Sequence, residues 1–253
     1  MSQQQLSAVI ITFNEEKNIA RCLDSVKEIA DEIIVLDSFS TDKTVEIAKR
    51  MGAVVHQQAF AGYIEQKNAA LDFANFDYVL SLDADEALDK FAIQAIKSEK
   101  ENFSAKAYTI NRCTNYCGRF IRHGSWYPDR KLRLFDKKIS RWGGINPHDR
   151  IELQMPFVAK HLKGDILHYS YNSVSEHILQ NNKFSSLTAE ALHKKGKKTS
   201  LFNMIVNPTW AFLLSYILRA GFMDGVEGFI IAVNVAQLSF LKHVKLYRLQ
   251  KNK

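Results

Sequence analysis

Apolar runs and more polar stretches alternate along the first part of the chain. The apolar runs are expected as strands and lie at Leu6–Thr12, Glu32–Leu36, Ala53–His56 and Tyr78–Leu80. Helices are expected between them, from Asn14 to Val26, up to Arg50 and from Tyr63 to Phe73. Asn14 is expected to be the N-cap of the first helix. Because strand and helix alternate four times, the pattern predicts an α/β fold, with a mostly parallel sheet and helices on both faces.

Beyond Leu80 the pattern becomes less regular. The further expected elements are a helix at Asp89–Lys100, strands at Ala107–Asn111, Lys131–Phe135 and Gly164–Tyr169, and a helix from Ser173 towards Lys195. Lys131–Phe135 alternates basic and apolar residues, which predicts a half-exposed strand. We expect loops at Gly118–Arg130 and Arg141–Arg150, and a Gly-Gly and an Asn-Pro pair mark turns in the second.

The C-terminal part has a different character. Leu201–Gly221 and Val226–Leu241 are apolar stretches, but polar residues interrupt both of them. Neither is a clean run of about 18–20 apolar residues, the length that crosses a membrane as a helix. We therefore expect two helices that lie in a membrane interface or pack on each other. The sequence predicts an α/β domain at residues 1–196 and a C-terminal helical extension at residues 197–253.

Composition limits the possible classes of protein. Hydrophobic residues make up 46% of the 253 residues and charged residues 24%, which is typical of a globular chain and excludes a disordered one. The three cysteines are too few and too uneven for a disulfide framework, so we expect a reducing compartment. The polar N-terminus has neither the basic nor the apolar region of a signal peptide, and none is expected.

The positive charge lies at the C-terminal end. From Glu190 onward there are ten Lys and Arg residues against three acidic ones, which accounts for the whole net charge of +7. Such a tail fits an anionic surface, either a membrane or a nucleic acid. Its basic residues alternate with long aliphatic runs, which is atypical of a nucleic-acid groove, so we expect no nucleic-acid partner. A solvated tail without a partner is the alternative.

Three acidic residues follow the fourth predicted strand. Side chains two apart on an extended strand point to the same side, so Asp83 and Asp85 can converge where an open α/β sheet binds its ligands. Carboxylate oxygens there suit Mg²⁺ or Mn²⁺. The alternative is a polar strand end in which Asp85 or Asp89 caps the next helix. At the end of the second strand, Asp37 can accept hydrogen bonds from ribose hydroxyls.

Other candidates have weaker signals. The sequence contains neither a G-x-G-x-x-G motif after the first strand nor a phosphate-binding P-loop motif, so side chains and a metal must hold any nucleotide. His168 lies near the end of the last predicted strand, where a lone histidine is more often structural than a metal ligand. The Arg141–Arg150 loop presents His148 and Asp149. It either carries catalytic residues or is a simple surface turn.

Three segments taken together resemble a known family. They are Val9–Glu16 (VIITFNEE), Ile34–Thr44 (IVLDSFSTDKT) and Leu82–Glu86 (LDADE). Their order and spacing resemble the N-terminal half of the family 2 inverting glycosyltransferases, which have the GT-A fold, a Rossmann-like nucleotide-diphospho-sugar transferase fold. Over nearly the whole chain the resemblance is greatest to bacterial lipopolysaccharide-core β-glucosyltransferases. The segments that extend it are Gln66–Ala70, Trp126–Arg130, Pro147–Asp149 and Gly221–Gly228.

The resemblance implies a UDP-sugar donor, most simply UDP-glucose, and Mg²⁺ or Mn²⁺ as cofactor. It assigns nucleotide-sugar binding to Thr12, Phe13, Glu15, Asp37, Lys67 and Asp83. It assigns the metal to Asp85, with Asp83 and His168 as further candidates, and the acceptor or diphosphate to Trp126, Arg130 and His148. Asp149 would be the catalytic base. Close relatives commonly have glutamate there, and aspartate is shorter by one methylene, so its loop must lie closer to the acceptor.

The expected function is transfer of a hexose to a lipid-anchored glycan such as lipopolysaccharide core. One alternative is a polyprenyl-phosphate hexosyl synthase, whose anionic acceptor needs no base. Another is a non-catalytic, membrane-peripheral protein that binds a nucleotide sugar. The basic residues flank the apolar stretches, so we expect attachment to the inner face of a bacterial cytoplasmic membrane. A helical pair that packs on the first domain is the alternative.

Overall fold

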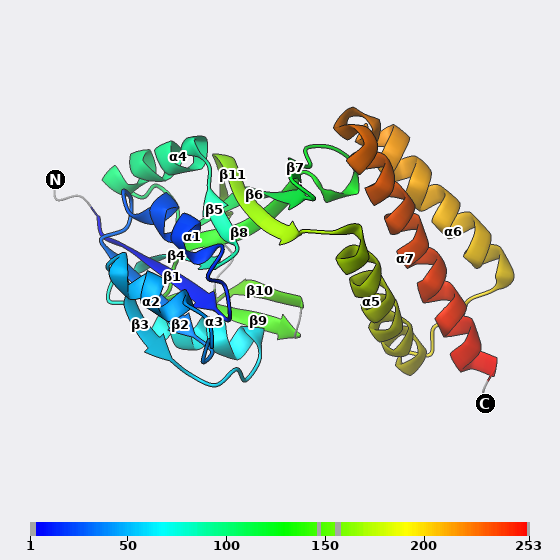
Figure 1. Cartoon of the computed structure of the whole chain (residues 1–253), viewed down its shortest axis with the longest axis horizontal. Coiled ribbons are helices and arrows are strands. Elements are labelled where there is room, and N and C mark those ends of the chain that lie inside the picture. Colours follow the sequence, from blue (N-terminus) through cyan, green and yellow to red (C-terminus); the bar gives the residue numbers. More distant parts are fainter. Residues whose placement is uncertain (1–3, 146–147, 155–157, 252–253) are drawn as a thin grey trace. The chain divides into compact units, whose positions relative to one another are not determined.

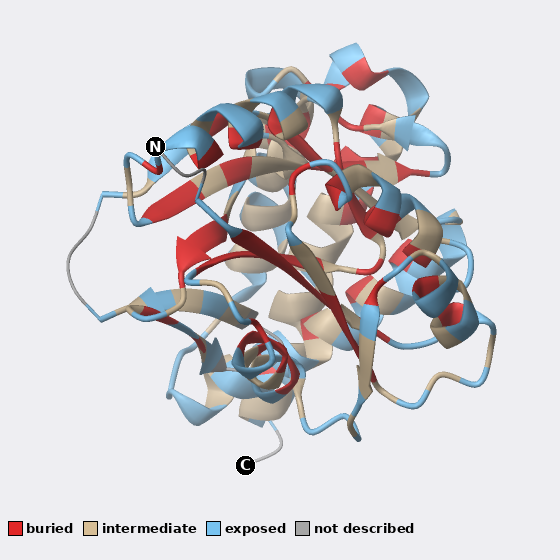
Figure 2. Cartoon of the chain, turned by 90° about the vertical axis from the view of Figure 1, so that its left-hand side faces the viewer, coloured by how far each residue is buried: buried red, intermediate tan, exposed pale blue. Residues whose placement is uncertain are grey.

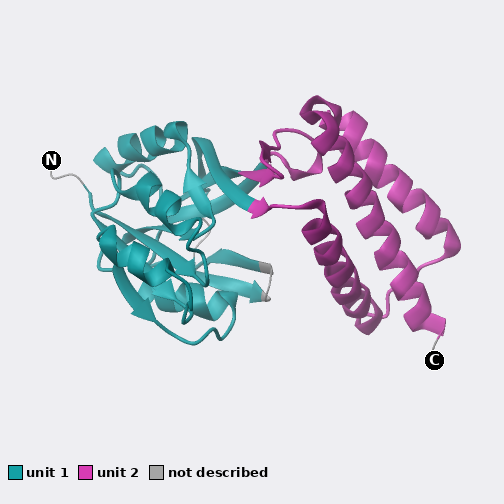
Figure 3. Ribbon diagram, in the orientation of Figure 1, with its two compact units in different colours: residues 1–112, 129–169 teal, residues 113–128, 170–253 magenta. Residues whose placement is uncertain are grey.

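The computed structural model describes residues 4–145, 148–154 and 158–251 of the chain. It divides into two compact units (Figure 3). Unit 1 contains residues 1–112 and 129–169, and unit 2 contains residues 113–128 and 170–253. The sequence predicted a glycosyltransferase domain at residues 1–196 and a tail at residues 197–253. These two segments were assigned by function, and the assignment stays a prediction.

The first half of the sheet in unit 1 is parallel. β1 (Leu6–Thr12) lies between β2 (Glu32–Asp37) and β4 (Tyr78–Asp83), and β3 (Val54–Gln57) is parallel to β2. The connecting helices are α1 (Ile19–Val26), α2 (Thr44–Arg50) and α3 (Tyr63–Asp72) (Figure 1). The predicted strand–helix alternation is confirmed here.

The second half makes the sheet mixed. It contains β5 (Glu86–Leu88), β6 (Ala107–Tyr116), β8 (Asp129–Asp136) and β11 (Lys160–Tyr171). Over the described residues the strand order is β3-β2-β1-β4-β8-β6-β11-β5, with β7 (Arg119–Phe120) paired to β6. β8 is antiparallel to β4 and β6, and β5 is antiparallel to β11. α4 (Lys90–Glu101) begins after its N-cap Asp89, whose side chain accepts a hydrogen bond from the Ala92 backbone.

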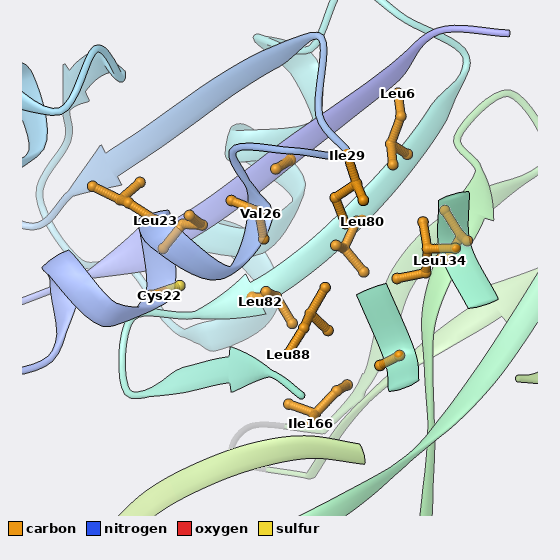
Figure 4. Close-up of a cluster of buried hydrophobic side chains, with 14 of the residues drawn as sticks. Leu6, Cys22, Leu23, Val26, Ile29, Leu80, Leu82, Leu88, Leu134 and Ile166 are labelled. Carbon is orange, nitrogen blue, oxygen red and sulfur yellow. The ribbon is translucent and has the colours of Figure 1, made fainter. Parts of the chain in front are cut away.

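Apolar side chains fill both faces of the sheet. β1 is buried along almost its whole length, as the burial colours show (Figure 2). Its alternate residues Leu6, Ala8 and Ile10 pack on one face, together with the residues that α1 presents at helical spacing (Figure 4). On the other face Val9 packs with the residues that α3 buries. Both faces of β1 are therefore covered, which fixes the carboxyl ends of the central strands.

Two local predictions are wrong. The first helix begins at Ile19, and Asn14 does not cap it. Asn14 has a φ of 54°, and its side-chain oxygen accepts a hydrogen bond of 2.8 Å from the Thr41 backbone. Its own N–H donates to the Ser40 hydroxyl at 2.8 Å. Asn14 thus joins the loops that follow β1 and β2, because its short polar side chain bonds the neighbouring loop better than it would cap a helix.

The expected loop at Arg141–Arg150 contains two antiparallel strands, β9 (Ser140–Ile145) and β10 (His148–Leu153). Its glycines lie within strand β9. A Cβ atom on Gly143 would lie 2.5 Å from the Glu152 side chain on the facing strand. Gly143 therefore leaves room for the Glu152 side chain. Asp149 lies on β10, opposite Gly144, so the prediction of a loop position for Asp149 is also wrong.

Unit 2 is mainly helical. It contains α5 (Val174–Lys194), α6 (Leu201–Leu213), a π-helical turn at Leu214–Leu218, a short 3-10 turn at Gly221–Asp224 and α7 (Gly225–Lys251). Among the described residues, the segments Leu201–Leu218 and Gly221–Lys251 are long and apolar enough to cross a membrane. The predicted pair of apolar helices is confirmed, and their membrane contact stays a prediction.

Candidate functional site

The carboxyl ends of three parallel strands meet at one edge of the sheet in unit 1. The strand register places Thr12 beside Asp37, and Ile11 beside Asp83. The hydroxyl of Thr12 is buried and has no hydrogen-bond partner. Polar residues at the carboxyl ends of parallel strands are typical of a ligand site in an α/β fold.

Asp83 lies between two cations. The Lys67 ammonium is 3.1 Å from its Oδ1 atom, and the Arg133 guanidinium is 3.4 Å from its Oδ2 atom. Burial alone would raise the pKa of Asp83, but these two positive charges outweigh it and hold the pKa well below its usual range. Asp83 is therefore ionised at every physiological pH.

Lys67 also reaches Asp149, which is 82 positions further along the chain. Its ammonium donates a 2.8 Å hydrogen bond to Asp149 Oδ2 and lies 4.4 Å from the centre of the Trp142 ring. The next residue, Asn68, exchanges two 2.9 Å hydrogen bonds with the Trp142 backbone. Helix α3 thus holds both β9 and β10, and it brings Asp149 to the acidic edge of the sheet.

Sequence reasoning missed Glu86 and Arg133. The Arg133 Nη2 atom donates a 2.8 Å hydrogen bond to Glu86 Oε1, and both side chains are buried. Burial by itself lowers the pKa of Arg133, but Glu86 and Asp83 reverse the effect and raise it. The prediction of a half-exposed strand at 131–135 is therefore wrong at Arg133, because two carboxylates neutralise its charge inside the protein. The only local signal for Arg133 was that it is a basic residue in a strand that alternates basic and apolar residues.

Asp85 and His168 form a second group. The strand ends at Asp83, and Asp85 lies on the turn before β5, so the argument from same-side strand positions does not apply to it. Strand β11 is antiparallel to β5 and brings the His168 Nε2 atom to 3.2 Å from Asp85 Oδ2. The Tyr169 N–H also donates to the Asp85 carbonyl at 2.9 Å. Asp89, and not Asp85, caps the next helix.

The donor atoms of Asp85 and His168 suit a divalent cation. Carboxylate oxygen and imidazole nitrogen are ligands of Mn²⁺, and the buried His168 Nδ1 atom has no hydrogen-bond partner. Within the described ranges, His, Cys, Asp and Glu side chains do not form a group of three that could hold a metal. Mg²⁺ sites commonly use only one or two protein carboxylates and fill the remaining positions with water and phosphate oxygens, so the pair fits such an ion.

Further candidates surround this edge. Burial raises the pKa of Glu15, and the negative charge of Asp85 adds to this effect, although a hydrogen bond from Asn18 opposes it. Asp37 is fully buried and accepts hydrogen bonds of 2.9 Å from the Ser40 backbone and the Gln57 amide. Phe13 follows β1 and is exposed, so its ring is free to contact a ligand.

The remaining predicted residues lie elsewhere. Trp126 belongs to unit 2, where its ring stacks on that of Tyr171, with centroids 5.4 Å apart, and contacts His177. Burial lowers the pKa of His177 to about 4, so this histidine is neutral. Arg130 lies exposed near the start of β8. His148 begins β10, and its side chain lies outside the described part of the structure, as does Pro147 before it.

Comparison with known proteins gives consistent results. The sequence model described as glycosyl transferase family 2 matches residues 7–163. A protein of Rickettsia typhi named as an uncharacterized glycosyltransferase is 36% identical over 97% of this chain and 88% of its own. The lipopolysaccharide core biosynthesis glycosyltransferase LpsC of Rhizobium meliloti is 29% identical over 96% of this chain and 92% of its own.

Among solved structures, the chain is similar to the mannosyltransferase PcManGT from Pyrobaculum calidifontis in complex with GDP-Man and Mn²⁺. The TM-score is 0.57 at 13% identity, over 97% of this chain and 88% of that one. At this identity the likeness concerns the fold alone, and it confirms the predicted GT-A fold. The sequence matches confirm that the protein is a glycosyltransferase.

Proposed function

Because the chain belongs to glycosyltransferase family 2, we propose that it moves a hexose from a UDP-sugar to a lipid-anchored glycan. The observation that carries this proposal is the chain of contacts from Asp83 through Lys67 to Asp149. It connects a nucleotide-side carboxylate to a candidate base through one buried ammonium. The name of the Rhizobium relative supports lipopolysaccharide core as the acceptor, and glucose is our choice for the transferred sugar.

The donor is held by side chains at the carboxyl edge of the sheet. The unbonded Thr12 hydroxyl and the exposed Phe13 ring line the base and ribose, together with Glu15. Asp37 binds the uridine, in exchange for one of the hydrogen bonds that it now accepts from Ser40 and Gln57. Asp83 faces the ribose, and its low pKa keeps it an acceptor. Arg130, Trp126 and His148 are assigned to the acceptor or the diphosphate.

Asp85 and His168 hold the cation, Mg²⁺ or Mn²⁺. When bound, the ion neutralises the negative charge that develops on the leaving diphosphate. The imidazole contributes through Nε2, the atom that lies 3.2 Å from Asp85. With Asp85 and His168 as the metal ligands, Asp83 binds the ribose and pairs with the side chains of Lys67 and Arg133.

Asp149 is the base that removes the proton from the acceptor hydroxyl as the hydroxyl attacks the anomeric carbon. One displacement inverts the configuration, so no covalent sugar–enzyme intermediate forms. Lys67 holds the Asp149 carboxylate in place at 2.8 Å. β10, which carries Asp149, pairs with β9, and Asn68 of α3 holds β9 by two hydrogen bonds; this fixed position compensates for a side chain one methylene shorter than glutamate. A positioned base contributes about 10²–10⁴-fold to the rate.

Asp149→Asn tests this assignment. We expect turnover to fall by roughly two orders of magnitude or more, whereas UDP-sugar binding, measured by calorimetry, stays within a few-fold of wild type. Glu152→Gln is the matched control, because Glu152 lies on the same strand with a side chain that is 52% exposed. Near-wild-type turnover by Asp149→Asn on a glycan acceptor would refute the role of the base.

The same variant separates the alternatives. A polyprenyl-phosphate acceptor is already anionic, so an Asp149→Asn enzyme that is fully active on it would favour the hexosyl synthase. A protein that only binds nucleotide sugars would show no metal-dependent turnover with any donor. The enzyme works at the inner face of the cytoplasmic membrane, to which unit 2 attaches it, because the net positive charge of the chain flanks the apolar helices there.

A further inference from the structure

Helix α6 and the π-helical turn after it expose an apolar face. From Leu201 to Leu218 every exposed residue except Thr209 is apolar. The exposed residues recur every three or four positions, as they do along one face of a helix. They are Leu201, Phe202, Ile205, Val206, Thr209, Trp210, Leu213, Ile217 and Leu218. A helix on the surface of a globular protein normally has the opposite arrangement, with polar residues outward.

The two asparagines of α6, Asn203 and Asn207, are half-buried, whereas Thr209 is exposed. Asn203 accepts hydrogen bonds from Ser200 in the capping box at the start of the helix. The Asn207 amide is 2.8 Å from the ring of His243 on α7, and the other ring nitrogen of His243 is 2.8 Å from the Thr199 hydroxyl. The partners of these polar groups lie within unit 2. Internal hydrogen bonds therefore satisfy the two asparagines, and the apolar face is the side of α6 that is left outward.

The neighbouring helices differ from α6. Within unit 2, α7 packs against both α5 and α6 and lies between them (Figure 1). α7 exposes a smaller share of its residues than α6, but Val226, Phe229, Val233 and Phe240 are exposed and apolar. The exposed surface of α5 is mixed, with Glu176, Lys183, Glu190 and Lys194 among its apolar residues. The apolar face therefore runs along α6 and continues onto the start of α7, where the Phe229 ring contacts those of Phe212 and Tyr216.

The charges around α6 are all of one sign. No acidic residue occurs between Glu190 and Asp224. Four exposed lysines, Lys194, Lys195, Lys197 and Lys198, precede the helix, and Arg219 follows the apolar face at its other end. Basic groups at both ends of an apolar helical face match an anionic lipid surface, which attracts the charges and buries the apolar side chains.

A membrane-crossing position does not fit the contacts of α7. Along its length α7 forms hydrogen bonds with polar groups of α5. If α7 crossed a membrane, α5 and its polar side chains would also have to lie in the lipid. The Asn181 amide donates to the Asn234 carbonyl at 3.1 Å, and the Lys245 ammonium donates to the Asn182 carbonyl and to the hydroxyls of Ser185 and Ser186. Lys245 therefore has its hydrogen-bond partners within unit 2.

From these observations we infer that α6 lies in the plane of an anionic leaflet, with its Leu201–Leu218 face and the exposed apolar start of α7 among the lipids and α5 outside. This inference specifies the membrane attachment proposed above, and it does not depend on catalytic activity. The substrate-binding edge of unit 1 plays no part in it. Lipid binding and sugar transfer can therefore be tested separately.

Vesicle sedimentation with the full-length protein tests the inference. Ile205 on α6 and Leu179 on α5 are both 70% exposed, so Ile205→Glu and Leu179→Glu make the same change at equally exposed sites. On vesicles of equal parts phosphatidylglycerol and phosphatidylcholine, Ile205→Glu should weaken binding about tenfold or more. Burying an isoleucine is favourable by at least the free energy of a tenfold change, and the added charge repels the lipid. Leu179→Glu should bind within about twofold of wild type.

A second measurement locates the helix. Lipids brominated in their chains should quench the tryptophan fluorescence of the wild type, and Trp210→Phe should remove this quenching. The inference is overturned if wild type does not bind the anionic vesicles, if both Glu variants lose binding equally, or if Trp210→Phe leaves the quenching intact. It is also overturned if wild type is a dimer that Ile205→Glu dissociates, because a second copy would then cover this face.

The catalytic proposal has its own control in this experiment. Metal-dependent hydrolysis of UDP-glucose, measured without lipid, should be the same in wild type and Ile205→Glu. Loss of vesicle binding with unchanged hydrolysis supports the lipid contact, whatever the natural acceptor is. Vesicle binding without hydrolysis in either protein would count against the proposed function and leave the assignment of α6 standing.

Discussion

Replacing Lys67 by methionine should destabilise unit 1 strongly. Methionine retains most of the length and apolar character of the lysine side chain but removes its charge. The ammonium neutralises Asp149 at 2.8 Å and Asp83 at 3.1 Å, and only 4% of the Lys67 side chain is exposed. Removing one partner of a buried ion pair typically costs about 3–5 kcal/mol, because the other charge stays behind without compensation.

An exposed ion pair provides the matched control. Lys138 lies 2.7 Å from Asp77, a distance as short as that in the Lys67 pair, but both side chains are more than half exposed. Such surface pairs are worth about 0–1 kcal/mol. Urea denaturation at pH 7 should therefore give a much lower midpoint for Lys67→Met than for Lys138→Met. Equal losses of unfolding free energy in the two variants would refute the reasoning, since burial would then make no difference.

The loss of unfolding free energy in Lys67→Met should also depend on pH. The pKa of Asp83 is depressed in the folded protein, so this residue adds stability above its unfolded pKa, and the addition is lost as the pH falls towards the folded pKa. Without Lys67 only Arg133 remains beside Asp83, so the depression of its pKa is smaller and the carboxylate takes up a proton at higher pH. The difference in unfolding free energy between wild type and Lys67→Met should then narrow as the pH falls below about 5. A difference that stays constant down to the acid transition would contradict this account.

Two further predictions concern the metal and the backbone. Asp85→Ala should abolish turnover and metal-dependent nucleotide binding while leaving the circular dichroism spectrum unchanged, and activity that survives both this change and EDTA would refute the metal mechanism. Gly164→Ala should cost roughly 3 kcal/mol or more in urea unfolding, because the new Cβ would lie 2.1 Å from the Ala92 nitrogen at a φ of +105°. Gly52→Ala, at a φ of +85° with open space around it, should cost only about 1 kcal/mol, and equal costs would show that the contact is unimportant.

The parts of the fold with a strong local signal could be predicted from the sequence. The strands at Leu6–Thr12 and Glu32–Asp37 are buried runs next to polar turns, and their ends agree with the prediction to within one residue. The helix that carries Lys67 was likewise expected at its observed position. In this parallel unit β1 pairs with β2 and β2 with β3, neighbours in sequence, whereas β4 returns to pair with β1, so the local pattern predicts the strands and their parallel direction but not their full order.

The rest depends on contacts between distant segments. Arg133 is buried because its partner Glu86, 47 positions earlier, lies across the sheet. His168 meets Asp85 only through the antiparallel pairing of β11 with β5. Asp149 lies on a strand because β10 pairs with β9, where it faces Gly144. The turn preferences of glycine and proline pointed to a loop there, and the tertiary pairing overrode them.

The linkage in the product tests the central claim most directly. UDP-glucose has the α configuration, and one inverting displacement assisted by Asp149 must give a β-linked product. The measurement is the anomeric proton coupling of the sugar that wild type transfers, with Mn²⁺ present, to a truncated lipopolysaccharide core in anionic vesicles. We expect a β-linked hexose that disappears when EDTA is added and is strongly reduced in Asp149→Asn. An α-linked product, or a β-linked product formed equally well without metal, would contradict the account.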